Sequence, residues 1–308
     1  MTLSSPVAFM VFNRPEKTRR VLEEIIRSNP PKIYVIADGA RASHPNDAEL
    51  VERTRSIISK LTSGLNVVKI FASENLGLRD RFLTGLDEVF AREQRAIILE
   101  DDCLPSQSFF KFVDEMLQNT DRDKLGIVSG SNFAPYKSRD RNYHFSTSPY
   151  IWGWGTQADV WHRFRADEQR EQWTNPEIEE VMKTFSTKGQ AKEFESMMRS
   201  AHKLNTWDIS FAVWLRQQGL LAAVPARNLV QNIGFGEGAT HTFFENFDVN
   251  LSAEELDFPL RHPPTIEPDK MRERLMWFTR RSRWLTFPIL HPFDFMGRVF
   301  RYLKTRTS

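Results

Sequence analysis

The residues with the clearest capacity for chemistry are three successive carboxylates, Glu100, Asp101 and Asp102, which directly follow the apolar run AIIL at 96–99. Carboxylates in contact repel each other and burial disfavours their charged form, so their pKa values rise unless a counter-ion neutralises them. Mg²⁺ and Mn²⁺ prefer carboxylates, waters and phosphate oxygens, and such an ion can stabilise charge on a diphosphate leaving group. We therefore expect a divalent cation at Asp102, with Glu100 and Asp101 facing ribose or sugar hydroxyls. The structural alternative is a solvated acidic turn that caps the next helix.

Polar residues also follow the other apolar runs of the N-terminal half. Asn13, Asp38 and Asn75 each come where such a run ends. Open α/β sheets bind ligands beyond the carboxyl ends of their strands, so these residues and the acidic run should lie along one edge. Arg79 and Arg81 follow closely, and an arginine here could pair with a diphosphate. A surface helix arginine is the alternative, and it is favoured for Arg81.

The elements that must position these residues alternate along the first half of the chain. Short apolar runs predict strands at 7–12, Ile33–Ala37, Val67–Phe71, 96–99 and 127–128. Helices are expected at 15–28, capped by Asn13, at 48–60, at 79–92, and after a Ser106 N-cap. This alternation predicts an α/β fold with a mostly parallel central sheet flanked by helices.

The pattern changes after Tyr150. The aromatic, glycine-rich stretch 148–161 leads into predicted helices at 157–164, 176–184, 191–204 and 209–218, a strand at 220–224 and a loop at 232–242. No linker-like composition separates the halves. We expect one catalytic domain over residues 1–250, with a nucleotide-binding half over about 1–130 and an acceptor-side half over about 131–250.

The C-terminal segment 251–308 has a different character, because about ten Lys and Arg residues against two acidic ones lie in 270–308, interleaved with aromatic residues. This combination suits the headgroup region of an anionic membrane, and a helix packed on the domain is the alternative. No recognition motif supports a nucleic-acid partner. We expect a basic, aromatic appendage.

The cysteine count and the hydropathy limit which cellular locations are expected for this protein. The single cysteine, Cys103, excludes an internal disulfide and a Cys-based zinc site. No basic segment precedes an apolar core at the N-terminus, and no apolar stretch approaches the roughly 18 residues of a spanning helix. A cytoplasmic protein, or one peripheral to the inner face of the plasma membrane, is expected.

Four segments, in order, resemble the GT-A fold glycosyltransferases, and within them the eukaryotic N-acetylglucosaminyltransferase I type. They are AIILEDDCLPSQSFFKFVDEML (96–117), YIWGWGTQADVWHRF (150–164), TWDISFAVWLRQQG (206–219) and NIGFGEGATHTFF (232–244). They resemble the family's acidic motif, aromatic–glycine segment, WD-containing helix and late glycine-rich loop. The resemblance covers about residues 6–245, but residues 174–205 and the C-terminal segment have no match. Without the signal anchor of the Golgi enzymes, the chain looks more like a bacterial relative acting on a cell-surface polysaccharide or lipopolysaccharide intermediate.

The resemblance implies a GT-A type nucleotide-diphospho-sugar transferase fold and particular residue roles at the strand edge. Asp102 would be the single direct protein ligand of Mn²⁺, and Asp38 would lie near the nucleotide base. Phe12, Asn13 and Arg14 would line the nucleotide pocket.

It also implies roles for residues of the second half. In inverting members a carboxylate on the WD helix is the base, which places Asp208 in that role; such a transfer needs a base for the acceptor hydroxyl. The alternative is an N-cap of the helix. His241 would reach the metal or the diphosphate, as a late histidine does in many GT-A enzymes, and a solvent-facing histidine is its alternative. Trp152, Trp154 and Trp207 could stack on sugar rings, with core packing as the alternative.

The function expected from this resemblance is metal-dependent transfer of a sugar from a nucleotide-sugar, with UDP favoured, to a hydroxyl of a glycan or lipid-linked glycan, with inversion. One alternative is a sugar nucleotidyltransferase, although the segment after the first strand, NRPEKTRR (13–20), lacks the glycines that usually hold a triphosphate. The other is a non-catalytic carbohydrate- or membrane-binding protein.

Overall fold

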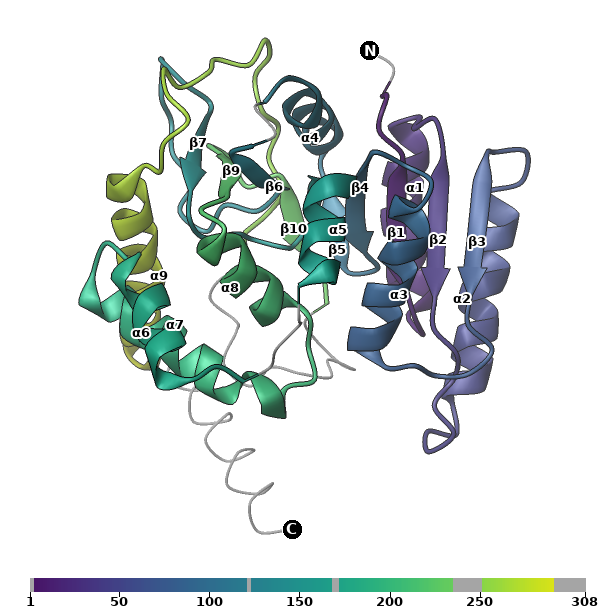
Figure 1. The fold of residues 1–308 in the computed structure, drawn as a ribbon. Helices are drawn as coiled ribbons and strands as arrows, with labels where there is room; N and C mark the ends of the chain where they lie inside the picture. The colour runs from purple at the N-terminus through teal and green to yellow at the C-terminus, as the bar shows by residue number, and fades with distance from the viewer. Residues whose placement is uncertain (1–2, 121–122, 168–171, 235–250, 291–308) are drawn as a thin grey trace.

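A computed structural model describes residues 3–120, 123–167, 172–234 and 251–290, with one large sheet at its centre (Figure 1). The sheet has eight strands in the order β3-β2-β1-β4-β8-β6-β9-β7. Its strands are β1 (Val7–Val11), β2 (Ile33–Ala37), β3 (Val67–Phe71), β4 (Arg95–Glu100), β6 (Leu125–Ser129), β7 (Tyr143–Ser146), β8 (Trp154–Gln157) and β9 (Leu221–Pro225). A second sheet pairs β5 (Cys103–Pro105) with β10 (Val230–Asn232).

The direction of the strands makes the sheet mostly parallel. Strand β1 lies parallel to β2 and β4, β2 lies parallel to β3, and β6 lies parallel to β9. Strand β8, between β4 and β6, and strand β7, at the β9 edge, run the other way. The carboxyl ends of β1, β2, β3 and β4 therefore meet at one edge, which confirms the predicted α/β class.

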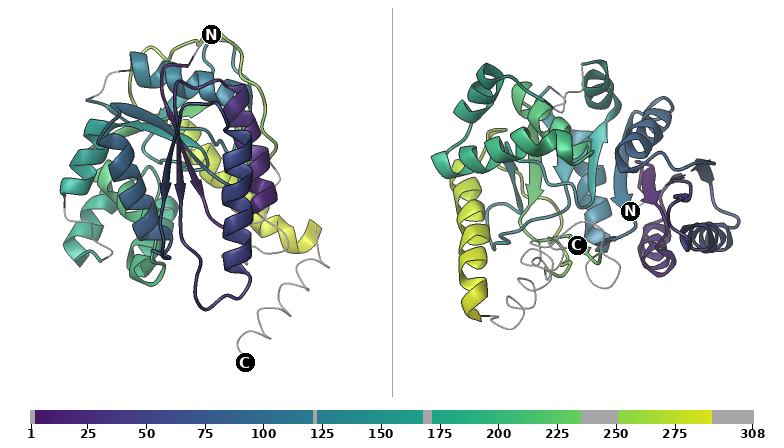
Figure 2. Two further views of the ribbon diagram at one scale, coloured as in Figure 1. Left: turned by 90° about the vertical axis from the view of Figure 1, so that its right-hand side faces the viewer. Right: turned by 90° about the horizontal axis from the view of Figure 1, so that it is seen from below.

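Helices cover both faces of the sheet (Figure 2). They are α1 (Pro15–Arg27), α2 (Asp47–Leu61), α3 (Leu78–Phe90), α4 (Gln107–Asn119), α5 (Ala158–Ala166), α6 (Asn175–Lys183), α7 (Lys188–Ser200), α8 (Asp208–Gln217) and α9 (Lys270–Leu290). Alternation along β1 sorts them, because successive side chains of a strand point to opposite faces. Val7, Phe9 and Val11 pack in a core with side chains of α1, α2 and α4. Ala8 and Met10 pack in a second core with α3, α5 and α8.

Strands β1, β2, β3, β4 and β6 lie where the apolar runs predicted them, and β9 lies one residue after the strand predicted at 220–224. Strands β5, β7, β8 and β10 were not predicted. Residues 143–146 and 154–157 form β7 and β8, although the sequence predicted no strand there. The helix expected at 157–164 instead starts one residue later, directly after β8. The Asn13 cap was also wrong: the N-cap position of α1 is Arg14, and no side chain caps it.

The described part of the C-terminal segment packs against the domain. Leu256 and Leu260 lie in the first core and Met276 in the second. Glu273 of α9 accepts hydrogen bonds from Ser146 Oγ at 2.9 Å and from the Thr147 amide at 2.6 Å. The helix is thereby fixed beside the end of β7. The division at residue 250 remains a prediction.

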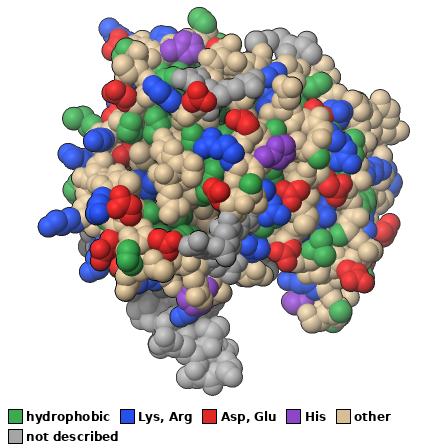
Figure 3. All heavy atoms as spheres, viewed as in Figure 1, with side chains coloured by type: hydrophobic (Ala, Val, Ile, Leu, Met, Phe, Trp, Pro, Cys, Tyr) green, Lys and Arg blue, Asp and Glu red, His purple; other side chains and the backbone are tan. Residues whose placement is uncertain are grey.

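The charged side chains are mixed over the face seen in Figure 3, where Lys and Arg alternate with Asp and Glu without a large patch of either sign. Within the described ranges, no helix combines the length and apolar character needed to cross a membrane.

Candidate active site

The acidic run lies at the carboxyl edge of the sheet, joined to the end of β1. Glu100 closes β4, and Asp101 and Asp102 form the turn into β5. The Arg14 guanidinium lies 3.2 Å from Asp101 Oδ1 and 2.8 Å from Asp102 Oδ2. The Phe12 amide donates to Asp101 Oδ2 at 3.3 Å. The two neighbouring strand ends are thus connected through these carboxylates.

The carboxylates at this edge are not fully neutralised by Arg14. Burial and the neighbouring carboxylates raise the pKa of Glu100 to about 8, and Asp208 is one of those neighbours. Burial and Asp102 likewise raise the pKa of Asp101 to about 6, although Arg14 acts in the opposite direction. Excess negative charge of this kind favours a bound cation.

The surroundings of Asp102 fit a hard divalent cation. Its side chain is 18% exposed, and carboxylate oxygens are the donors that Mg²⁺ and Mn²⁺ prefer. The backbone at Gly234 comes so close that an added Cβ would lie 2.3 Å from Asp102 Oδ2. Among the described residues, no three His, Cys, Asp or Glu side chains are grouped to hold a metal on their own. The metal at Asp102 remains a prediction.

Lys17 is a contributor to this edge that the sequence did not single out. Its Nζ donates to the Gly234 carbonyl at 2.9 Å, which ties α1 to the end of the described late loop. Burial and the neighbouring Arg14 lower the pKa of Lys17, whereas Asp102 and Asp101 act in the opposite direction. Arg14 and Lys17 are three residues apart at the start of a helix, so both cations lie on the same side of it, beside the carboxylates. This spacing could have indicated from the sequence that Lys17 belongs to the acidic edge.

Asp38 and Asn75 lie together and bind each other rather than standing open at the edge. Asp38 is buried and accepts from the Leu76 amide at 2.9 Å, the Gly77 amide at 3.0 Å and Asn75 Nδ2 at 2.9 Å. Its carboxylate joins the loop after β2 to the loop after β3. A position near the nucleotide base remains a prediction for Asp38, but its hydrogen bonds are structural.

Phe12 and Asn13 are held by the loop before α2 and by the first residue of that helix. Asn13 Nδ2 donates to Asp47 Oδ1 at 2.7 Å, and Arg41 Nε lies 2.5 Å from Asp47 Oδ2. The Arg41 guanidinium lies over the Phe12 ring, 5.2 Å from its centroid. Arg41 and Asp47 carry no sequence signal, because only the fold brings them to the end of β1.

The two arginines of α3 have different surroundings. Arg81 is 7% exposed and donates from Nη2 to the Ile70 carbonyl at 2.9 Å, so the surface interpretation was wrong for it. Arg79 Nη1 lies 3.2 Å from Asp80 Oδ1. Contact of Arg79 with a diphosphate remains a prediction.

Asp208 is the first residue of α8, and the N-cap position falls on Trp207. Its Oδ1 accepts from Thr206 Oγ1 at 2.5 Å and from the Ile209 amide at 2.9 Å. Within the described part of the chain, Oδ2 has no hydrogen bond. The carboxylate raises the pKa of Glu100, so the start of α8 and the end of β4 share one electrostatic environment. Among the described residues, the Asp208 carboxylate is therefore held through Oδ1 alone.

Two of the three predicted stacking tryptophans belong to the core. Trp154 and Trp207 are 1% and 3% exposed. The Trp207 ring stacks on Phe82 with 3.9 Å between centroids and on Trp154 with 5.5 Å. The sugar-stacking prediction is wrong for these two, because their faces are covered by other rings. Trp152 is half-buried, edge-on to Phe133. His241 lies outside the described residues.

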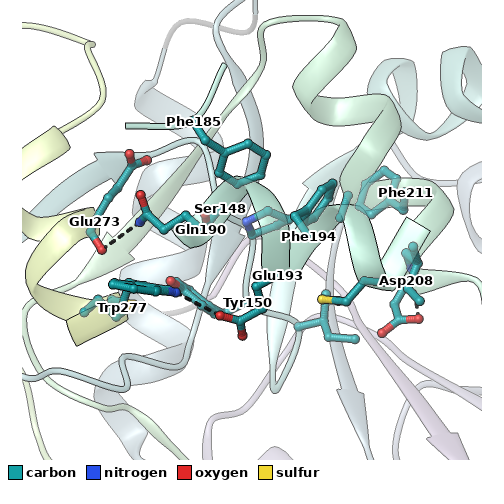
Figure 4. A pocket seen from close by; sticks show the side chains of 16 residues that line it. Ser148, Tyr150, Phe185, Gln190, Glu193, Phe194, Asp208, Phe211, Glu273 and Trp277 are labelled. Carbon is teal, nitrogen blue, oxygen red and sulfur yellow. Dashed lines mark hydrogen bonds between the residues drawn. The ribbon is translucent and has the colours of Figure 1, made fainter. Parts of the chain in front are cut away.

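A cavity of ≈ 200 Å³ opens beside Asp208 (Figure 4). Its walls come from the loop 148–151, from α7, from the first turns of α8 and from α9. Glu273 and Trp277 lie at one end, Asp208 lies at the other, and Phe194 lies between them. The cavity could not be predicted from the sequence, because α7 and α9 lie outside the resembling segments.

Comparison with known proteins leaves the family of this chain open. No family model matches, and no curated protein matches. Among solved structures, the inositol-1-phosphate CTP transferase from T. maritima matches with a TM-score of 0.41 and 8% identity, covering 83% of this chain and 100% of that chain. A mannose-1-phosphate geranyltransferase from Thermus thermophilus matches with a TM-score of 0.36 and 10% identity, covering 72% and 73%. A UDP-glucose pyrophosphorylase complexed with UDP-glucose matches with a TM-score of 0.36 and 11% identity, covering 72% and 91%. These likenesses are too distant to assign a function.

Proposed function

We propose that this protein is a transferase that binds a nucleotide-sugar at the carboxyl edge of β1, β2 and β4 and moves the sugar to an acceptor hydroxyl. One observation carries the proposal. Asp208 lines the cavity and also acts electrostatically on Glu100 at the acidic edge, and among the described residues its Oδ2 accepts no hydrogen bond. We take the edge as the place for the donor and the cavity as the place for the acceptor.

The residues present suit the parts of such a reaction. Arg14 and Lys17 supply positive charge beside a diphosphate, and the Gly234 backbone approaches closely enough to line its site. A divalent cation held at Asp102 would neutralise charge on the leaving diphosphate. Asp208 Oδ2 takes the proton of the acceptor hydroxyl. The acceptor oxygen forms a bond to C1 of the sugar while the bond from C1 to the diphosphate oxygen breaks, and the diphosphate leaves.

A second candidate is a sugar nucleotidyltransferase. Arg14 and Lys17 favour it, because two cations directly after the first strand would also suit the triphosphate of a nucleotide substrate. The open Asp208 and the adjoining cavity favour glycosyl transfer, because a nucleotidyl transfer to a sugar phosphate has no need of a base on that side.

The two candidates differ in the product that they release. Purified protein would be incubated with UDP-, GDP- and CMP-sugars, and separately with nucleoside triphosphates plus sugar 1-phosphates, each with and without Mn²⁺. We expect manganese-dependent release of free nucleoside diphosphate or monophosphate from one nucleotide-sugar. Release of pyrophosphate from a triphosphate would instead establish the second candidate. The absence of both turnover and nucleotide binding would refute both candidate functions.

We also propose that the outer face of α9 contacts an anionic lipid surface. Met271, Leu275 and Phe278 are 79%, 48% and 61% exposed, and their spacing of four and three residues puts them on one helix face. The stripe is flanked by exposed cations, which are Lys270, Arg274 and Arg281. Exposed apolar side chains bordered by cations suit insertion among anionic headgroups.

Sedimentation with vesicles tests this contact. The full chain should bind vesicles that contain phosphatidylglycerol and not vesicles of phosphatidylcholine alone. Leu275→Asp with Phe278→Asp should reduce binding at least tenfold, whereas Leu65→Asp, which alters an apolar side chain 43% exposed elsewhere, should not. The proposal would be refuted if the double variant bound vesicles as well as the unaltered protein does. It would also be refuted if the double substitution disrupted a dimer of the protein and left vesicle binding unchanged.

A further inference from the structure

The cavity beside Asp208 is built largely by parts of the chain that contribute no strand to the sheet. Phe185, Gln190, Glu193 and Phe194 come from α7 and the turn before it, and Glu273, Met276 and Trp277 come from α9. The loop 148–151 and the start of α8 close the remaining sides. The cavity is therefore a feature of this chain's own helices, distinct from the nucleotide edge.

The charged side chains that line the cavity are all acidic. Its ionisable carboxylates are Glu193, Asp208 and Glu273, and no Lys or Arg is among the described residues that line it. Glu273 is engaged by donors from Ser146 and Thr147. Phosphate or carboxylate groups would meet repulsion from Asp208, which is half-buried, and from Glu193, which is exposed and therefore more strongly screened by solvent.

A buried cation, Arg216, lies close enough to Glu273 to offset its charge, so the excess of negative charge in the lining comes from Glu193 and Asp208. Arg216 is 6% exposed, with its guanidinium 3.7 Å from the centroid of the Phe185 ring. Its Nη1 donates to Thr184 Oγ1 at 2.9 Å and its Nη2 to Ser148 Oγ at 3.3 Å. Arg216 therefore lies behind the wall and supports Phe185.

Fixed polar groups and apolar faces alternate around the space (Figure 4). Glu193 Oε2 accepts from Trp277 Nε1 at 2.8 Å, and Gln190 Nε2 donates to the Glu273 carbonyl at 3.1 Å. Rings and aliphatic groups, including Phe194 and Ile209, make up most of the remainder. A sugar ring has this character itself, with hydroxyls around its rim and C–H groups on its faces.

The size admits a single ring. An apolar cavity of about 150 Å³ takes a benzene molecule, and this one measures ≈ 200 Å³. Met197, one of the lining residues, is 41% exposed, so the wall reaches solvent there.

We propose that this cavity binds the terminal ring of the acceptor, and that this ring is a sugar without phosphate or carboxylate, either neutral or amine-bearing. The inference rests on the proposed function, because it makes Asp208 the group that meets the ring's reacting hydroxyl. Glu193 accepts hydrogen bonds from other polar groups of the ring, and the aromatic walls cover its face.

Binding of simple sugars tests the cavity separately from catalysis. Methyl glycosides, glucosamine and glucose 6-phosphate would be titrated by NMR into the full chain, and UDP binding would be measured in parallel. We expect the neutral or amine-bearing sugars to bind at least tenfold more tightly than the 6-phosphate. Equal or tighter binding of the 6-phosphate would overturn the proposal, as would no binding of any sugar.

Two variants assign the binding to this cavity. Ala212→Phe fills it and should weaken sugar binding at least tenfold without changing UDP binding. Glu193→Gln keeps its shape and should weaken binding about tenfold through loss of a charged acceptor. Glu195→Gln, on the same helix but paired with Arg199, is the matched control and should have no effect. Unchanged sugar binding in both cavity variants would refute the site. Sugar binding without any nucleotide binding would refute the proposed transferase function but would still support the sugar site. If Ala212→Phe does not fold, Glu193→Gln alone tests whether the sugar binds in this cavity.

Discussion

Asp102→Ala should abolish manganese-dependent nucleotide binding and reduce sugar transfer by about 10²–10³-fold. The side chain lies 2.8 Å from Arg14, and its environment already holds more negative charge than that arginine offsets. Without Asp102 the edge loses the oxygens best placed for a cation and much of the charge that attracts it. Calorimetric titration of the nucleotide with and without Mn²⁺ measures the first effect, and nucleotide release measures the second.

Two further variants make this result specific to the carboxylate. Asp102→Asn preserves the shape and should lose nearly as much, because it removes the charge. Asp159→Ala removes an exposed carboxylate from the first turn of α5 and should leave binding and turnover unchanged. Full manganese-dependent binding by Asp102→Ala would show that the acidic run is a structural turn.

Asp208→Asn should reduce transfer by about 10²–10⁴-fold while nucleotide binding stays within about twofold of the unaltered protein. The substitution removes the group that accepts the hydroxyl proton. It leaves unchanged the groups at the ends of β1 and β4, where we propose that the nucleotide binds. An asparagine oxygen can still accept from the Ile209 amide, as Asp208 Oδ1 does at 2.9 Å. The helix start is therefore retained, and the cost in free energy of unfolding should stay below about 1 kcal/mol.

The comparison of rate with stability separates the two roles of this carboxylate. Urea denaturation gives the free energy of unfolding, and initial rates with one nucleotide-sugar give the transfer. A large rate loss at nearly unchanged stability identifies a base. A stability loss of several kcal/mol with a proportionate rate loss would identify a residue that only starts α8. In a nucleotidyltransferase, pyrophosphate release would be unaffected by this substitution.

The parallel half of the sheet could be predicted from sequence because its strands are buried on both faces. VAFMV in β1 and IYVIA in β2 are continuous apolar runs with every residue buried. YHFS in β7 and WGTQ in β8 are equally buried but contain polar residues or glycine. They form strands through antiparallel pairing with β9 and with β4 and β6, which local composition does not encode.

The residues of the candidate site likewise differ in whether the local sequence could indicate them. The acidic run could be singled out because three carboxylates directly after an apolar run are a local property of the sequence, and Asp208 was singled out only through the resemblance of its segment to the WD-containing helix. The burial of Trp207 could not, because its partner Phe82 lies far away in the sequence. Asp38 was placed at the correct edge, yet its engagement by the amides of Leu76 and Gly77 depends on the geometry of the following loop.

The placement of α7 and α9 has a consequence for how proteins built on this plan can diverge. Neither helix contributes to the sheet, and neither contacts the acidic edge through any residue described above. Substitutions at Glu193, Phe194 or Trp277 can accumulate under selection for a new acceptor while the donor edge stays under selection of its own. Relatives should accordingly be recognisable by the β1–β4 edge and differ most in these two helices.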